Sequence, residues 1–170
     1  SKVIRESLAN ANLRIIPLNR EIDFLKSYLR LEQMRFPDKF DFEIRCEKEN
    51  TISFVRIPPM LVQPFAENSI RHGFMSLKYK GFLSIFFETE KEDILKCTIT
   101  DNGTGRQKMQ GQIQNLQDDR LHSGKITETR IRLFNNSKTP EKYKIVYTDL
   151  FIKEEPCGLK VEIYMPMEKG

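Results

Sequence analysis

The segment that says most about the fold is IPPMLVQPFAENSIRHG, residues 57–73. Two prolines lie near its start, apolar residues follow, and it closes with four polar side chains: Glu67, Asn68, Arg71 and His72. Proline in a first turn and glycine just past the last turn are typical of an α-helix. We therefore predict a helix over 59–72 that Gly73 ends. A helix that only fills a core needs none of the four polar groups, whereas a site for magnesium and phosphates could use several.

The spacing of these polar residues suggests such a site. Asn68, Arg71 and His72 stand at i, i+3 and i+4, which places them on one helix face. A carboxamide oxygen is a hard, neutral ligand that magnesium accepts while keeping waters and phosphate oxygens. Arg71 and His72 can donate to phosphates, and Glu67 can orient a water or take a proton. The alternative is a surface ion pair between Glu67 and Arg71, at i and i+4, as is common at charged helix ends.

A second motif, TDNGTG at 100–105, follows a strand-like segment. The carboxylate of Asp101 can accept the amino proton of an adenine ring. Gly103 and Gly105 allow positive φ and let a flat ring approach the backbone. The alternative is a plain hairpin turn. However, the long polar stretch over 106–124 follows, where a hairpin needs an immediate return strand.

The remaining periodicity outlines an α+β fold. A helix is predicted over 18–36, with Asn19 as its cap and Pro37 as its stop. Alternating or apolar runs predict strands over 39–47, 81–90, 93–101, 142–152 and 158–167, and a short helix is predicted over 126–136. These elements favour a two-layer α/β sandwich, with a mixed, mostly antiparallel sheet covered by helices on one face.

Composition excludes several classes of protein. The chain has 170 residues, 39% of them hydrophobic and 31% charged, which suits one folded domain. Its net charge of +4 is small, and its basic residues are scattered among acidic ones, so we expect no nucleic-acid partner. No run predicts a membrane span or signal peptide, and the start without Met predicts a piece of a longer protein. Three scattered cysteines, Cys46, Cys97 and Cys157, predict reduced thiols without a zinc site.

Together these motifs resemble the ATP-binding domain of LytS-like sensor histidine kinases, within the ATPase superfamily that includes gyrase and MutL. PLNREIDFLKSYLRLEQMRF resembles the helix before that domain, IPPMLVQPFAENSIRHG its N box, and DNGTG its first glycine box. TETRIRLFN resembles the helix after the ATP lid, and GLKVEIYMP the last strand. The resemblance implies a Bergerat sandwich. It also implies a division into 1–36, the end of a linker helix plus the helix leading in, and 37–170, the ATP-binding catalytic domain.

The resemblance also implies roles for individual residues. Asn68 would be the Mg2+ ligand and Glu67 the catalytic residue, assisting the proton or water network. The residues implied to bind ATP are Asn68, Arg71, His72, Asp101, Gly103, Gly105, Ser123, Gly124, Lys125 and Thr127. The second glycine box departs from the family, because Gly124 is the only glycine in LHSGKITETR. Side chains and backbone N–H groups at a helix N-terminus would contact the phosphates there.

The implied function is transfer of the ATP γ-phosphoryl group to a histidine outside this chain. That histidine would lie on the dimerisation helix, since His72 and His122, the only histidines here, are expected in the pocket and the lid. A response regulator would then receive the group. The chain would be the cytoplasmic domain of a membrane-anchored homodimer in the inner membrane, inactive when isolated.

Two alternatives remain open. The first is a degenerate nucleotide-binding module that signals by contact, suggested by the second glycine box. The second is a clamp ATPase, which would need a catalytic glutamate one turn before Asn68, where this chain has Pro64.

Overall fold

A computed structural model of the chain describes residues 15–47, 54–91, 93–106, 127, 129 and 144–169. Its helical elements are α2 (Leu18–Arg35), α4 (Gln63–Asn68) and the π-helical η1 (Ser69–Phe74), which continues α4 without a break. The long strands are β2 (Phe40–Cys46), β4 (Gly81–Lys91), β5 (Ile94–Asp101), β6 (Lys144–Ile152) and β7 (Glu155–Pro166). The short strands are β1 (Ile16–Pro17), β3 (Val55–Ile57) and β8 (Glu168–Lys169).

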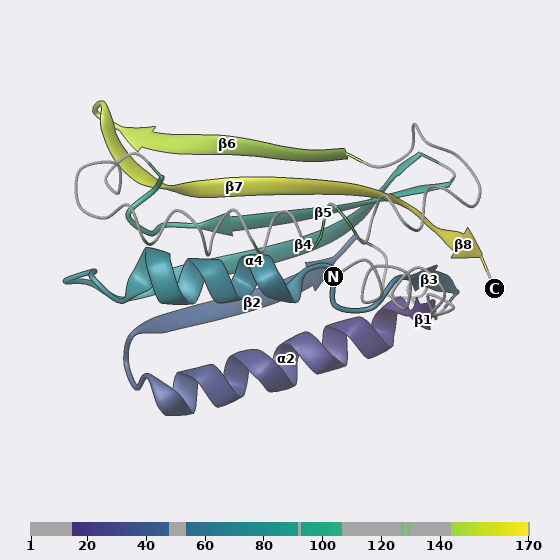
Figure 1. The fold of residues 1–170 in the computed structure, drawn as a ribbon, viewed down its shortest axis with the longest axis horizontal. Helices are drawn as coiled ribbons and strands as arrows, with labels where there is room; N and C mark the ends of the chain where they lie inside the picture. Colours follow the sequence, from purple (N-terminus) through teal and green to yellow (C-terminus); the bar gives the residue numbers. More distant parts are fainter. Residues whose placement is uncertain are drawn as a thin grey trace, which may run out of the picture.

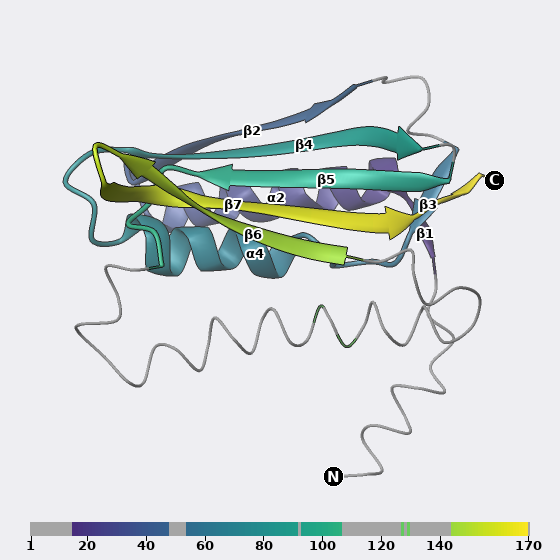
Figure 2. The same ribbon diagram turned by 90° about the horizontal axis from the view of Figure 1, so that it is seen from above.

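The long strands form a five-stranded sheet in the order β2-β4-β5-β7-β6 (Figure 2). Strands β2 and β4 are parallel, and the other neighbours are antiparallel. The predicted mixed, mostly antiparallel sheet is therefore confirmed, with strand bounds close to those expected. A second, three-stranded sheet, β1-β3-β8, was not predicted, because strands of two or three residues are too short to show alternation.

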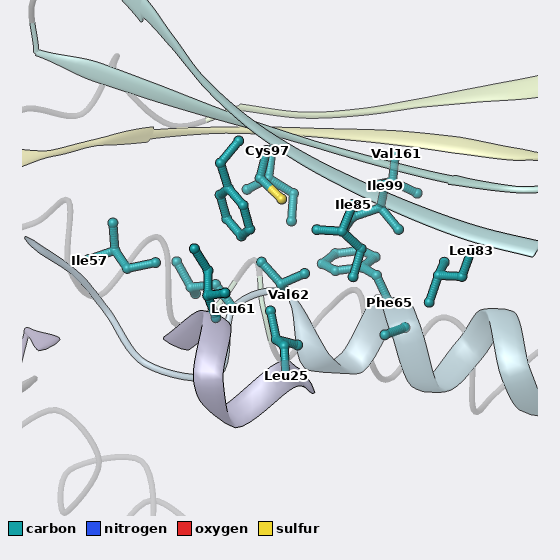
Figure 3. Close-up of a cluster of buried hydrophobic side chains, with 14 of the residues drawn as sticks. Leu25, Ile57, Leu61, Val62, Phe65, Leu83, Ile85, Cys97, Ile99 and Val161 are labelled. Atoms are coloured by element: carbon teal, nitrogen blue, oxygen red, sulfur yellow. The ribbon is translucent and has the colours of Figure 1, made fainter. Parts of the chain in front are cut away.

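Helices α2 and α4 cover the same face of the large sheet, as predicted (Figure 1). Strand β5 shows why: Leu95, Cys97 and Ile99 are buried, while the residues between them are partly exposed. The buried side chains of the sheet meet those of the two helices in a single core (Figure 3). All three cysteines are free thiols, as expected.

Helix α2 packs into this same core through residues such as Leu25 and Leu29, both fully buried. The predicted Asn19 cap is wrong. Pro17 occupies the N-cap position, since its extended backbone (φ −58°, ψ 139°) pairs with β3. The helix ends at Arg35, just before Pro37, as expected. The division between 1–36 and 37–170 stays a prediction.

The helix predicted over 59–72 starts later and runs further. Met60 has a positive φ of 58°, so the chain turns there and α4 begins only at Gln63. Gly73 does not end the helix but lies inside η1. The reason is its backbone: Gly73 has no positive φ, so it does not adopt the left-handed conformation with which a glycine ends a helix. The tight position is Gly103, where a Cβ would lie 2.7 Å from the Cα of Gly73, whereas a Cβ on Gly73 would meet Gly103 at an ordinary 3.6 Å.

Some predictions fall outside the described residues. These are the loop over 106–124, apart from Arg106, and the helix over 126–136, apart from Thr127 and Thr129, which are both helical. Among the described helices, none is long and apolar enough to cross a lipid bilayer.

Candidate functional site

Asp101 is the central residue of the candidate site. It ends β5 on the core side of the sheet and is only 6% exposed. Its Oδ2 accepts the hydroxyl proton of Ser69 at 2.6 Å, and its Oδ1 accepts the backbone N–H groups of Gly103 at 2.9 Å and Leu159 at 3.3 Å. These bonds come from η1, from the DNGTG turn and from β7. The carboxylate is therefore fixed as an acceptor where three segments meet.

The predicted glycines shape this corner in different ways. Gly105 has a positive φ of 70°, as expected. Gly103 does not, so the expected positive φ is wrong for it, and its lack of a side chain lets η1 approach instead. A third glycine, Gly158, has φ 141°, and a Cβ there would lie 1.9 Å from the backbone oxygen of Asp101. Any side chain at Gly158 would push β7 away from Asp101.

The four polar residues at the end of α4 do not form one group. Arg71 Nη2 lies 2.9 Å from Glu67 Oε1, with the side chains 56% and 34% exposed, so the ion-pair alternative is realised. This pair lies towards α2: burial, then the charges of Glu32 and Glu67, raise the pKa of Tyr28 to about 12.

The other two predicted residues have different surroundings. His72 is buried, and its backbone oxygen accepts the hydroxyl of Thr104 at 3.3 Å, which ties η1 to the DNGTG turn. Asn68 is half-buried at the junction of α4 and η1. The structure thus separates Arg71 from His72, which the helical spacing placed together.

The second glycine box is described at Thr127 and Thr129, and the first of these is the predicted site residue. The side chain of Thr127 is fully buried, and its Oγ1 has no hydrogen-bond partner within the described part of the chain. Ser123, Gly124 and Lys125 lie outside the described residues. A buried hydroxyl without a partner is costly in a protein that binds nothing there, so Thr127 is consistent with a ligand contact.

The side chains that could coordinate a metal ion are scattered in the described part of the chain. Over residues 15–47, 54–91, 93–106 and 144–169, no cluster of three His, Cys, Asp or Glu side chains could hold a metal ion by itself. Magnesium bound to a nucleotide can take one amide oxygen from a protein while phosphate oxygens and waters complete its shell, so the Asn68 amide is of a kind that fits Mg-ATP.

A feature that the sequence did not reveal anchors the end of the DNGTG turn. The Nε and Nη2 atoms of Arg106 each donate to the carboxylate of Asp149 on β6, both at 2.8 Å. The guanidinium also lies 5.4 Å from the ring centroid of Tyr147. The partners are 43 residues apart in the sequence, so no local pattern indicates the contact. The pair fixes the chain directly after Gly105.

The Arg106–Asp149 pair predicts a pH-dependent stability. The hydrogen bonds from Arg106 lower the pKa of Asp149 from 3.8. A lowered pKa means that the stabilisation is present above the unfolded-state value and is lost as the pH falls through the folded-state value. Because the Arg106 side chain is 43% exposed, we expect Asp149→Asn to reduce the free energy of unfolding by about 1 kcal/mol at neutral pH.

Urea unfolding of both proteins from neutral to acid pH measures this effect. The difference should shrink over roughly pH 5 to 2, as the native carboxylate is protonated. A difference that stays constant over that range would mean that the ion pair does not stabilise the fold.

Comparisons with known proteins show what the chain is similar to. A family described as histidine kinase matches residues 1–40. The sensor protein LytS of Oceanobacillus iheyensis is 29% identical over 166 residues, which cover 98% of this chain and 28% of that protein. LytS of Staphylococcus haemolyticus is 32% identical over 105 residues, 62% of this chain and 18% of that protein. The chain thus spans about a quarter or less of these relatives.

Solved structures show the same fold. The histidine kinase domain of a blue-light activated kinase from Erythrobacter litoralis superposes with a TM-score of 0.59 at 17% identity, over 89% of this chain and 61% of that one. The catalytic domain of histidine kinase ThkA gives 0.56 at 11% identity, over 90% and 94%. The fold is therefore that of histidine kinase catalytic domains. Within that class, the sequence comparisons confirm the resemblance to the ATP-binding domain of LytS-like sensor histidine kinases.

Proposed function

We propose that this chain is the ATP-binding catalytic domain of a two-component sensor histidine kinase, and that it transfers the γ-phosphoryl group of ATP to a histidine outside the chain. The observation that carries the proposal is the hydrogen bonding at Asp101, at the end of β5. Ser69, in the first motif, donates to Asp101, in the second, at 2.6 Å. The two motifs that the resemblance assigns to opposite ends of one nucleotide are thus joined in one place.

Each end of the nucleotide would meet a different group. The fixed acceptor Asp101 would take the amino group of adenine, and Gly103 and Gly105 would form the floor beneath the ring. Asn68, one residue before Ser69, would offer its amide oxygen to the magnesium ion that accompanies the phosphates. A bound magnesium ion would neutralise charge on the phosphates. The protein would contribute positioning and electrostatics, which dominate phosphoryl transfer.

The remaining predicted residues would contact the phosphates. These are Arg71, His72, Ser123, Gly124, Lys125 and Thr127. Glu67 is paired with Arg71, so its contribution would be to hold that guanidinium in place, rather than to accept a proton. His72 and Arg71 would approach the phosphates from different sides of η1.

The proposal extends to the whole protein. ThkA has been solved in complex with the response regulator protein TrrA, with a TM-score of 0.56 to this chain at 12% identity. A response regulator is the partner proposed here too, after transfer to a dimerisation helix upstream. The LytS relatives are sensor proteins, and we propose the same setting for this chain: the cytoplasmic domain of a homodimer anchored in the inner membrane.

Calorimetric titration of the chain with ATP, with and without Mg2+, tests the proposal. We expect binding that Mg2+ strengthens, no steady hydrolysis, and phosphorylation only of an added polypeptide that carries the upstream histidine helix. An absence of binding at millimolar nucleotide would favour the degenerate module. Steady hydrolysis would favour the clamp ATPase.

A further inference from the structure

Glu21 is a buried carboxylate that the site described above does not use. It lies in the first turn of α2 and is only 1% exposed, between core residues such as Leu18 and Leu25. Glutamate is almost never fully buried unless a donor satisfies it. Here its Oε2 accepts the backbone N–H of Met60 at 3.0 Å, across 39 residues of sequence. The bond links α2 to the turn that precedes α4.

That turn has an unfavourable conformation. Met60 has φ 58°, in the left-handed region, which a residue with a side chain rarely adopts. Helix α4 begins at Gln63, and its N-cap residue, Val62, makes no capping hydrogen bond through its side chain. Since the helix supplies no cap of its own, a contact from outside the segment must hold its start in place. The hydrogen bond from Met60 to Glu21 is such a contact.

The position of this turn sets the position of Asn68. Leu61 and Val62 are both fully buried, so the segment between Met60 and α4 is packed on all sides. Asn68 is the last residue of α4, a helix of only six residues. A shift or rotation at Met60 would therefore be carried almost directly to the Asn68 amide.

Helix α2 also lies near the other end of this segment, at Glu67 and Arg71. The charges of Glu67 and Arg71 both act on Tyr28, one heptad beyond Glu21 on the same face of α2. Thus α2 lies near both ends of the stretch from Met60 to Arg71, and Glu21 accepts its hydrogen bond at the start.

We propose that Glu21 is a positioning residue: through the N–H of Met60 it fixes the start of α4, and so places Asn68 at a set distance from Asp101. The inference rests on the proposed function for its effect on nucleotide binding, but the effect on Asn68 itself does not. Asn68 would hold the magnesium end of the nucleotide, whereas Asp101 also accepts from Gly103 and Leu159, which lie outside α4 and η1. Loss of the Glu21 contact should therefore weaken the magnesium end selectively.

The test compares Glu21→Met, which keeps the volume but removes the acceptor, with Glu21→Gln, whose amide oxygen can still accept from Met60. Asp23→Ala, which removes an exposed carboxylate two residues further along α2, is the matched control. Kd for ATP is measured in Mg2+ and in EDTA. We expect Glu21→Met to weaken binding about tenfold in Mg2+ and less than about twofold in EDTA, with Glu21→Gln within about threefold of the parent.

A purely structural role gives a different pattern. Equal losses in Mg2+ and in EDTA that follow the thermal unfolding temperature, or no recovery in Glu21→Gln, would overturn the proposal. Glu21→Ala, which removes the acceptor by truncation, should rank with Glu21→Met and serves if that variant does not fold.

A nucleotide-free readout separates this inference from the proposed function. If the parent chain binds no ATP, the proposed function fails, and 15N–1H spectra without nucleotide decide the role of Glu21. The amide signals from Met60 to Asn68 should move in Glu21→Met, return towards the parent positions in Glu21→Gln, and stay in place in Asp23→Ala. Unmoved signals in Glu21→Met would overturn the positioning role.

Discussion

Replacing Asn68 by aspartate should lower phosphoryl transfer at least about 100-fold, because it puts a negative charge beside the phosphates at the magnesium end of the site. Asparagine offers magnesium a neutral oxygen, and phosphate oxygens and waters complete the shell. A carboxylate there would repel the same phosphates that the ion must hold. The half-buried position of Asn68 strengthens the repulsion, since water screens it less.

Transfer of labelled γ-phosphate from ATP to a polypeptide carrying the upstream histidine helix measures this loss. Asn19→Asp makes the same chemical change at an exposed position of α2, far along the chain from the motif, and should leave the rate unchanged. Asn68→Ala separates the lost ligand from the added charge, and we expect its rate to lie between the other two. If Asn68→Asp transfers phosphate as fast as the parent chain, Asn68 is not the magnesium ligand.

The features predicted correctly from sequence are those with a local signal. Strand β5 alternates buried and half-exposed residues over its whole length, so its type and its core face could be read from eight residues. The helix stop at Pro37 and the positive φ of Gly105 likewise depend on one residue and its neighbours. Each of these properties follows from backbone geometry that holds in any protein.

The features that were missed depend on contacts between distant segments. Asn19 is a good capping residue, yet Pro17 takes the cap position because β1 pairs with β3. Gly73 resembles a helix stop, yet the helix continues through it, and Gly103, from another part of the chain, packs against it. Local preferences of about 1 kcal/mol are easily outweighed by such tertiary contacts.

The same contrast applies to the candidate site. Asp101 was predicted as an adenine contact because two glycines follow it and a long polar stretch takes the place of a return strand, and that contact stays a prediction. The pairing of Arg106 with Asp149, and of Glu21 with the N–H of Met60, spans 43 and 39 residues, and neither has a sequence motif. These contacts hold the motifs in place without belonging to them. A scan for motifs alone would therefore find the groups predicted to touch a ligand and miss those that support them.

Asp101→Asn should have the second large effect, on nucleotide choice as well as affinity. The Oδ1 atom of Asp101 accepts two backbone N–H groups, so an asparagine would keep its oxygen there and place its NH2 group at the Oδ2 position, beside Ser69. The serine hydroxyl can rotate to accept from that NH2 group. We therefore expect the fold to survive, with a loss of about 1–2 kcal/mol in the free energy of unfolding.

Unlike the serine hydroxyl, the amino group of adenine cannot switch from donor to acceptor. It would face an NH2 donor in place of an acceptor, so binding of ATP should fall at least about 100-fold. Inosine triphosphate, which carries a carbonyl oxygen at the same ring position, should lose much less and bind Asp101→Asn more tightly than ATP does. Calorimetry with both nucleotides measures the reversal, and Asp41→Asn, an exposed carboxylate paired with Lys80, is the control that should change neither. Since only a group that contacts the purine directly can reverse the preference between amino and carbonyl, an equal loss for both nucleotides would place Asp101 outside the base-binding contact.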